Sequence, residues 1–384
     1  MTHPRASDVG GVERQAHSIA VALLDAGHEV HFFCQRADAG IDPRLRIHRL
    51  SNPLRPLRWF KVWWFDRASE RAVRDAGPFD LVQGFGKTSR QDVYFDGSGC
   101  LADFQRWSVD ATIDAEWRRA LRRASPHQRV VARIEGNRYT PGNYRRILAI
   151  SDLVRDQILA RYGLPSEDVE TLYPGVDLER FRPDAARAAE ARRSLGLSEA
   201  TPLLAFLGSD YRRKGLPVFL ETLARLEGVH GFVIGNERAE RVRAFQEDAR
   251  QLGVGDRVHW LGVQPEPEAW LAAADAFLFP THFDAFGSAV LEALACGVPA
   301  IVSREAGAAE LVEPGRTGDT LERTAPVAAW AEAAAEWLVR EGRDQRCADA
   351  RAAAEAHPWS RHVGRILELY QELGKSPPVV PHGG

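Results

Sequence analysis

The chain is poor in cysteine and in long apolar runs, and each shortage argues against a class of protein. Its 384 residues contain four cysteines, which form no CxxC pair: Cys34, Cys100, Cys296 and Cys347. Such wide spacing argues against a disulfide framework or a zinc site. It favours a protein that works in the reducing cytosol. No apolar run reaches the roughly 18 residues that a membrane span needs. The polar start MTHPRASDV predicts no signal peptide.

An excess of charge of one sign is also missing. The 50 basic and 53 acidic residues leave a formal net charge of −3, which argues against nucleic acid as a partner. No GxGxxG follows a predicted strand, as a dehydrogenase would need. No DxD-type carboxylate pair follows a strand either, so we expect no metal cofactor.

Short apolar runs alternate with amphipathic helical patterns such as Arg14–Asp25, Leu216–Leu226 and Arg238–Gln251. This alternation predicts an α/β protein with parallel sheets and crossover helices. The predicted strands are Glu29–Cys34, Leu45–Leu50, Leu81–Phe85, Arg146–Ile150, Val169–Tyr173, Leu203–Gly208, Gly231–Gly235, Val258–Leu261, Ala276–Phe279 and Ala300–Ser303.

The length predicts two domains at roughly 100–200 residues each. The charged, proline-marked segment PGVDLERFRPDAARAAEARRSLGL suggests a boundary, giving domains 1–174 and 175–358. A last helix over 359–373 is expected to pack back on the first domain, and the tail 374–384 to be disordered. The first helix has only MTHPRASDV before it, so its preceding strand is predicted to be missing.

A basic loop, in GSDYRRKGLPVFLETL, follows the predicted strand that ends at Gly208. Ligands of open α/β sheets bind at the carboxyl ends of strands. Arg213 and Lys214 would stand there at the start of a helix, with one forked and one compact cation for a diphosphate. A solvated surface loop is the alternative.

A second loop leads into a helix in THFDAFGSAVLEALACG, with Ser288 as the predicted N-cap and Gly297 as the C-terminal cap. Asp284 lies in the loop and Glu292 about one turn into the helix. Carboxylates hold the vicinal hydroxyls of a sugar well, so the two could hold a donor sugar and a ribose. Backbone N–H groups near Gly287 and Ser288 would face the phosphates between them. Alternatively, Glu292 is merely exposed.

Three segments, GGVERQAHSIAVALLDAGHEV, RRKGLPVFLETLARL and FDAFGSAVLEALACGVPAIVSREAGAAELV, together resemble the family-four retaining glycosyltransferases. The resemblance implies the GT-B fold, in which two Rossmann-like domains face a central cleft. GFGKTSRQDVYFDGSGC and LGSDYRRKG are most similar to the branch of lipopolysaccharide core glucosyltransferases.

The resemblance also implies roles for individual residues. Asp284 would contact the donor sugar, Glu292 the ribose, and Arg213 with Lys214 the diphosphate. Gly10 and Gly11 would let the backbone approach the β-phosphate closely. The family usually has Glu where this chain has Asp284, so the side chain is shorter by one methylene.

The acceptor side is predicted in the N-terminal domain, where DVYFDGSGC follows a strand and a polar loop. Family members carry a donor- or acceptor-contacting His or Asp in this region, and Asp96 is the candidate, with Ser98 as the alternative in register. An ordinary Asp-Gly turn is equally open.

Two stretches, 55–67 and 104–133, mix arginine with aromatic residues. Arginine can meet lipid phosphates while indole rings lie at the interface, so 104–133 predicts contact with an anionic membrane surface. A core of tryptophans with a solvated arginine face is the alternative. The expected location is cytoplasmic, peripheral to the inner face of the cytoplasmic membrane.

The predicted function is transfer of a hexose, with UDP-glucose favoured as donor, to a hydroxyl of a lipopolysaccharide-core or other cell-envelope glycan, with retention of configuration. Two alternatives stay open: a GT-B nucleotide-sugar epimerase, and a catalytically inactive scaffold that binds a nucleotide sugar.

Overall fold

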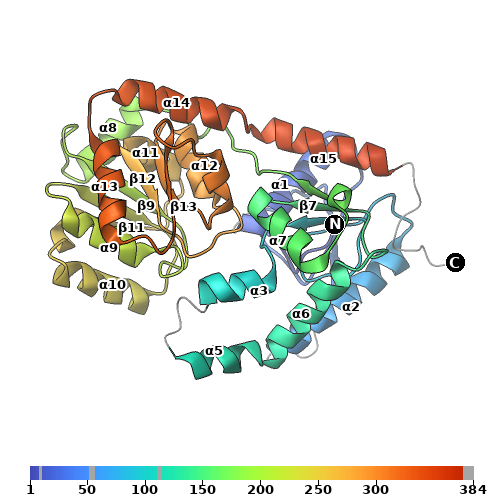
Figure 1. Cartoon of the computed structure of the whole chain (residues 1–384). Helices are drawn as coiled ribbons and strands as arrows, with labels where there is room; N and C mark the ends of the chain where they lie inside the picture. The colour runs from blue at the N-terminus through green and yellow to red at the C-terminus, as the bar shows by residue number, and fades with distance from the viewer. Residues whose placement is uncertain (8–10, 52–56, 110–114, 375–384) are drawn as a thin grey trace. The chain divides into compact units, whose positions relative to one another are not determined.

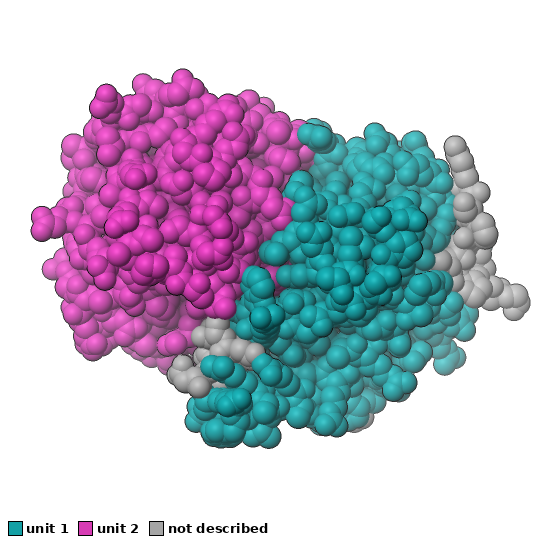
Figure 2. All heavy atoms as spheres, in the orientation of Figure 1, with its two compact units in different colours: residues 1–173, 360–384 teal, residues 174–359 magenta. Residues whose placement is uncertain are grey.

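The structure is a computed structural model that describes residues 1–7, 11–51, 57–109 and 115–374. It divides into two compact units, coloured separately in Figure 2. The N-terminal unit comprises Met1–Tyr173 and Ser360–Gly384, and the C-terminal unit comprises Pro174–Trp359. The predicted disorder at 374–384 concerns a segment that, beyond Gly374, lies outside the described residues.

Parallel strands form the middle of the N-terminal unit (Figure 1). One group, β2 and β4, is paired along its whole length, and a second group pairs in the order β5-β6-β7-β8. A further short pair joins β1 to β3. The strands are β1 (Arg5–Ala6), β2 (His31–Cys34), β3 (Arg36–Ala37), β4 (Arg46–Arg49), β5 (Gln83–Gly84), β6 (Val93–Asp96), β7 (Arg146–Ala149) and β8 (Val169–Thr171).

The start of the chain differs from the prediction that the first strand is missing. Thr2 forms parallel bridges with both Phe33 and Gly84, and so it joins β2 to β5. Its N–H donates to the Gln83 carbonyl oxygen at 2.9 Å, and its own carbonyl oxygen accepts from Phe85 N at 3.1 Å. The sequence pattern did not predict pairing here because the segment is polar. Strand pairing uses backbone N–H and C=O groups, which polar residues carry as well as apolar ones.

Helices cover the N-terminal sheet, and burial recurs along them with helical periodicity. In α1 the buried positions are Gln15, Ala16, Ile19, Ala20 and Leu23, one stripe of the helix. The last helix belongs to the same unit, because His362 Nδ1 bonds to the Tyr173 carbonyl oxygen at 2.8 Å. The helices are α1 (Gly11–Asp25), α2 (Arg58–Ala76), α3 (Leu101–Phe104), α5 (Glu116–Arg123), α6 (Pro126–Arg138), α7 (Asp152–Tyr162) and α15 (Trp359–Leu373).

The C-terminal unit has one six-stranded parallel sheet in the order β11-β10-β9-β12-β13-β14. Its central strands are buried on both faces, as parallel strands between two helix layers must be. The strands are β9 (Leu203–Leu207), β10 (His230–Ile234), β11 (Val258–Gly262), β12 (Ala276–Phe279), β13 (Ala300–Ser303) and β14 (Gly318–Leu321).

Two layers of helices cover this sheet (Figure 1). Alternate strand residues such as Leu204, Phe206 and Leu278 pack with Phe219 and Trp330 in one apolar core. That layer is α9 (Leu216–Arg225), α10 (Ala239–Gln251) and α13 (Val327–Leu338). The other is α8 (Ala185–Ser194), α11 (Pro267–Ala273), α12 (Ser288–Ala295) and α14 (Arg343–Glu355), which contact one another in series.

Candidate active site

Two loops of the C-terminal unit leave the sheet at the same edge. β9 ends at Leu207 and β12 at Phe279, and the two strands are hydrogen-bonded neighbours in parallel register. The loops 208–215 and 280–287 therefore begin side by side at the carboxyl ends of their strands, where open α/β sheets bind ligands.

Backbone contacts hold the first loop against the second. The Arg213 carbonyl oxygen accepts from His282 N at 2.9 Å and from Thr281 Oγ1 at 3.1 Å. Gly215 has a φ of +85°, and a Cβ there would lie 1.9 Å from the Pro280 carbonyl oxygen. Only glycine fits where the two loops cross. Because Gly215 holds the backbone there, it also fixes the position from which the preceding Lys214 side chain extends.

The charged side chains of the two loops meet. Asp284 Oδ2 forms an ion pair with Lys214 Nζ and lies 3.4 Å from Arg213 Nη1. Arg213 also donates to the Phe283 carbonyl oxygen at 2.8 Å and to Asp210 Oδ2 at 3.1 Å. The structure thus brings together three of the four charged residues predicted to bind the donor. We call Arg213, Lys214 and Asp284 the charged cluster.

The charges of this cluster perturb one another. Burial alone would raise the pKa of Asp284, but the charges of Lys214 and Arg213 outweigh burial and lower it. Burial also lowers the pKa of Lys214, which Asp284 opposes. The side chains of Arg213, Lys214 and Asp284 keep exposed fractions of 20%, 14% and 15%. The three side chains thus keep part of their surface exposed at this edge of the sheet.

Helix α12 begins next to this cluster, but not as predicted. Gly287, with a φ of +92°, is the N-cap residue, and Ser288 is the first helical residue and makes no capping bond. A Cβ at Gly287 would lie 2.9 Å from Phe279 Cε1, so close packing on β12 requires glycine here. The prediction of Ser288 as N-cap was wrong because the left-handed turn one residue earlier starts the helix.

The remaining prediction for α12 concerns its far end and its acidic residue. Gly297 follows the C-cap Cys296 with a φ of +75°, as a C-terminal glycine should. Glu292 is half-buried and lies four residues after the exposed Ser288, hence on the same helix face. Ser288 and Glu292 thus share the side on which α12 is open.

Asp96 ends β6 in the N-terminal unit, and its carboxylate holds the following turn. Oδ1 accepts from Ser98 N at 3.0 Å and from Gly99 N at 2.9 Å, while Oδ2 accepts from Tyr139 Oη at 2.5 Å. The residue is 1% exposed. These contacts hold the turn in place, and the predicted catalytic role of Asp96 stays a prediction. Ser98 is the exposed side chain of this turn.

Comparison with known proteins identifies the enzyme class. The sequence family described as Glycosyltransferase Family 4 matches residues 9–180, and the one described as Glycosyl transferases group 1 matches residues 188–355. The crystal structure of WaaG, a glycosyltransferase involved in lipopolysaccharide biosynthesis, is similar with a TM-score of 0.82. The two chains share 21% identity over 96% of this chain and 98% of that one. This chain is a glycosyltransferase of the GT-B fold.

Other relatives agree on the class and differ in the substrates that they name. The chain is 27% identical to a D-inositol 3-phosphate glycosyltransferase of Xylanimonas cellulosilytica, over 99% of this chain and 95% of the relative. A crystal structure of HepE from Anabaena, in complex with UDP and glucose, has a TM-score of 0.70 at 16% identity and covers 97% of this chain and 98% of that chain. The lipopolysaccharide assignment is therefore one of several that the relatives suggest.

The glycine pair at the start of α1 is described only in part, because Gly10 lies outside the described residues. Gly11 opens α1, and a Cβ there would meet no atom within 4 Å. The helix start is close to the Asp96 turn, because a Cβ on Gly97 would lie 3.1 Å from Val12 Cγ2. Gly11 is therefore not required by packing in this glycosyltransferase.

Lys87 is a cation of the N-terminal unit whose position the sequence did not single out. It follows β5 with a φ of +60°, a left-handed conformation that non-glycine residues seldom adopt, and its side chain is exposed. Asp66 of α2 accepts from Ser89 N and Ser89 Oγ at 2.6 and 2.9 Å, which holds the loop in place. The sequence feature that could have pointed to Lys87 is a lysine directly after a glycine near the end of a strand, in GFGKTSR.

Metal-ligand clusters and membrane-spanning helices are both absent from the described ranges. Within those ranges, no group of three or more His, Cys, Asp or Glu side chains could hold a metal ion. None of the helices described there is long and apolar enough to cross a bilayer.

Proposed function

We propose that this glycosyltransferase moves a hexose from a nucleoside diphosphate sugar, with UDP-glucose favoured, to a hydroxyl of a lipopolysaccharide-core or other cell-envelope glycan, with retention of configuration. The observation that carries the proposal is the charged cluster of Arg213, Lys214 and Asp284 beside the start of α12. No metal cofactor is needed, because these cations can take the diphosphate charge themselves.

The donor would bind along the loop edge of the C-terminal sheet. Arg213 and Lys214 would hold the diphosphate, with the N–H groups at Gly287 and Ser288 as further donors. Glu292, on the same face of α12 as Ser288, would accept from the ribose hydroxyls. Asp284 would accept from a hydroxyl of the donor sugar once the diphosphate draws the cations toward itself.

Bond cleavage places new negative charge on the leaving diphosphate. The backbone of the loop that carries Arg213 and Lys214 is held by hydrogen bonds, so both cations can stabilise that charge once they have turned from Asp284 to the diphosphate. The leaving phosphate oxygen would take the proton of the acceptor hydroxyl on the same face, which needs no protein nucleophile. In the N-terminal unit, Gly11 would approach the β-phosphate, and Asp96 would act as a positioning residue for the turn that carries Ser98.

The choice of donor and acceptor is supported by relatives rather than by contacts. HepE was crystallised with UDP-glucose, and WaaG acts in lipopolysaccharide biosynthesis. The curated relatives instead name D-inositol 3-phosphate. D-inositol 3-phosphate is a polar, hydroxyl-rich molecule, and a cell-envelope glycan shares that chemistry.

The transfer can be tested with a donor panel. UDP-, GDP- and ADP-hexoses are incubated with the enzyme and a core oligosaccharide or inositol phosphate, and the product is analysed by NMR. We expect release of one nucleotide only with acceptor present, and a product with the donor's anomeric configuration. Acceptor-independent conversion of the donor sugar would identify an epimerase, and an inverted product would contradict retention.

Membrane contact is the second part of the proposal, and it rests on α5. Trp117 and Leu121 lie four residues apart on one face of this helix, with exposed fractions of 62% and 64%. The guanidinium of Arg118 lies 5.2 Å from the Trp117 ring centroid, and Arg122 is also exposed. Of the predicted stretch 104–133, residues 110–114 lie outside the described ranges. An exposed apolar pair among arginines suits an anionic bilayer surface at the cytoplasmic face.

Vesicle flotation tests this contact. With vesicles of phosphatidylglycerol and phosphatidylcholine, Trp117→Ala with Leu121→Ala should lower the bound fraction at least about tenfold, from the lost apolar burial. Leu252→Ala, an exposed leucine of the C-terminal unit, is the matched control. Equal binding of both variants would contradict docking through α5.

A further inference from the structure

A hollow of the C-terminal unit lies at the amino edge of the sheet, opposite the loops that carry the charged cluster. Its volume is about 190 Å³. Three of its lining residues, Pro202, Asp275 and Pro299, directly precede the neighbouring strands β9, β12 and β13. In a parallel sheet the amino edge is remote from the carboxyl edge, so this hollow is separate from the donor site.

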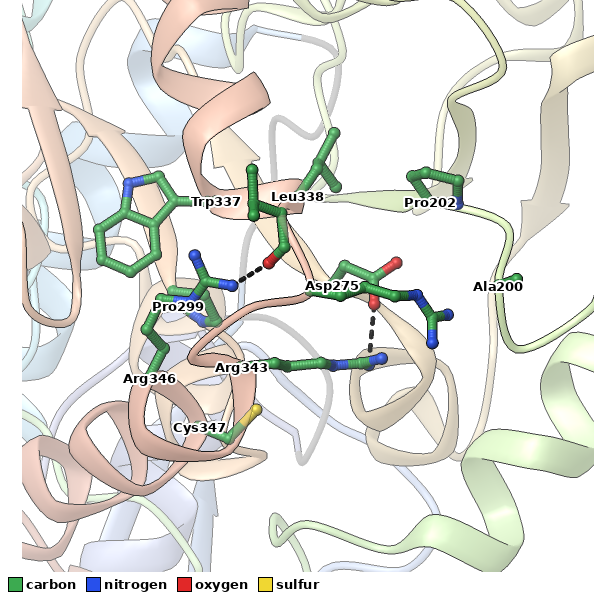
Figure 3. Close-up of a pocket in the computed structure, with 11 residues that line it drawn as sticks. Ala200, Pro202, Asp275, Pro299, Trp337, Leu338, Arg343, Arg346 and Cys347 are labelled. Atoms are coloured by element: carbon green, nitrogen blue, oxygen red, sulfur yellow. Dashed lines mark hydrogen bonds and ion pairs between the residues drawn. The ribbon is translucent and has the colours of Figure 1, made fainter.

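Arginine side chains dominate the charge around the hollow. Arg340, Arg343 and Arg346 line it from α14 and the segment before that helix, against Asp275 as the lining carboxylate. Figure 3 shows Arg343 reaching Asp275, while Arg346 is turned toward the carbonyl oxygen of Val339 after α13. The chain as a whole is slightly acidic, with a formal net charge of −3, so the excess of cations at the hollow is a local feature.

Asp275, the carboxylate that lines the hollow, already interacts with more positive charge than its own negative charge can neutralise. Asp275 Oδ2 accepts from Arg192 Nη2 at 2.9 Å and from Leu203 N at 2.8 Å. Its Oδ1 pairs with Arg343 Nη2 at 2.8 Å. Two guanidinium groups and a backbone N–H thus share one negative charge, which leaves the positive charge of Arg340 and Arg346 uncompensated by Asp275.

Arg346 and Arg340 do not find that compensation elsewhere in the hollow. Arg346 donates to the carbonyl oxygens of Glu336, at 3.1 Å, and of Val339, which are dipoles at the end of α13 and not full charges. The exposed Arg340 has no side-chain hydrogen bond or ion pair to any residue of the described ranges. Glu341 and Asp344 are exposed like Arg340, and within the described ranges neither forms an ion pair with it.

We propose that this hollow is an anion site for a small phosphate monoester, distinct from the donor site and beyond the proposed transfer reaction. Guanidinium forks match the oxygens of a phosphate and form strong charge-assisted hydrogen bonds with it. Pro202 and Leu338, both half-buried, give the hollow apolar walls that the carbon part of the ester can contact.

A purely structural role would explain two of the arginines but not the third. Arg343 holds Asp275, and Arg346 caps the last turn of α13. Arg340 supports neither contact, so its removal leaves the fold intact and takes away a charge of the site. Arg340→Ala is therefore the informative variant, and Arg346→Gln is the second.

Calorimetric titration of the full chain with glycerol 3-phosphate, and separately with inorganic phosphate, tests the proposal. We expect saturable binding that Arg340→Ala weakens about tenfold, with an unchanged melting temperature. Arg340→Lys should keep part of the affinity. Arg213→Ala with Lys214→Ala should leave this binding in place. Stronger binding of the ester than of inorganic phosphate would assign the apolar walls to the ligand's carbon part.

Three outcomes would overturn the site. They are absence of saturable binding at millimolar ligand, equal affinity in wild type and Arg340→Ala, and loss of binding in the Arg213→Ala/Lys214→Ala variant. The last would place the phosphate in the donor site. Because that variant separates the two sites, failure of this proposal leaves the proposed transfer reaction untouched.

Discussion

The two units use a carboxylate at a strand end in opposite ways. In the C-terminal unit, Asp284 follows β12 and pairs with Lys214, and its side chain stays 15% exposed. In the N-terminal unit, Asp96 ends β6, is 1% exposed and accepts three hydrogen bonds from its own unit. The two carboxylates thus differ in their partners, which are partly exposed cations for Asp284 and uncharged hydrogen-bond donors for Asp96.

The largest effect expected from this comparison concerns the cations. Arg213→Ala with Lys214→Ala should lower kcat/KM by about a thousandfold, because two charge-assisted bonds to the diphosphate are lost. Steady-state kinetics with the preferred donor measures this. Arg212→Ala removes an exposed arginine next to the cluster and is the matched control. Near-normal turnover of the double variant would show that the diphosphate binds elsewhere.

Two glycines sharpen the comparison between the units. Gly215→Ala should cost about 3 kcal/mol of unfolding free energy, from a left-handed backbone and a collision with the Pro280 carbonyl oxygen. Gly11→Ala meets no atom and should leave stability unchanged. Urea denaturation of both variants checks this. A loss of activity in a stable Gly11→Ala protein would indicate close approach of a substrate at Gly11.

Asp96 should matter for stability more than for chemistry. Asp96→Ala leaves two backbone N–H groups and the Tyr139 hydroxyl without their partner, at a cost of about 2–3 kcal/mol. Thermal unfolding measures the loss, and Ser98→Ala, in the same turn, is the control. If Asp96→Asn kept its stability but lost all turnover, Asp96 would be a catalytic residue after all.

Acid should weaken the N-terminal unit through His362. Burial lowers the pKa of His362 to about 4, whereas an unfolded histidine titrates near about 6.5. Between these values the unfolded chain binds a proton that the folded chain refuses, so stability is complete above about pH 6.5 and falls as the pH drops toward 4.

The loss at pH 5, relative to pH 7.5, should be about 2 kcal/mol. Urea denaturation at both pH values measures it. His362→Gln keeps a donor for the Tyr173 carbonyl oxygen and removes the titration, so this part of the pH dependence should vanish. An unchanged pH dependence in that variant would assign the acid sensitivity to other groups.

The local sequence pattern was enough to predict the bounds of elements that are buried on both faces or strongly amphipathic. The predicted strands Ala276–Phe279 and Ala300–Ser303 and the helix Trp359–Leu373 have the observed bounds. The strands β6 and β14 were missed, because VYFD ends in a polar residue and GDTL has one apolar residue. Their pairing is decided by neighbours that are distant in sequence.

The predicted site residues show the same division between what local pattern predicts and what depends on distant contacts. Strand-loop-helix order placed Arg213, Lys214 and Asp284 at one sheet edge, because neighbouring parallel strands end together. The inward turn of Asp96 could not be foreseen, since it depends on Tyr139, 43 positions away. The N-cap of α12 depends on the left-handed Gly287 packed on Phe279, a contact that sequence spacing does not reveal.

The central claim is that the charged cluster binds the diphosphate of a nucleotide sugar. Calorimetric titrations of wild type and of Arg213→Ala/Lys214→Ala with UDP and, separately, with uridine measure what the diphosphate contributes to the binding free energy. The account predicts that wild type prefers the diphosphate by about a hundredfold or more, and that the double variant loses this preference while still binding the nucleoside. An undiminished preference for UDP in the double variant would contradict it.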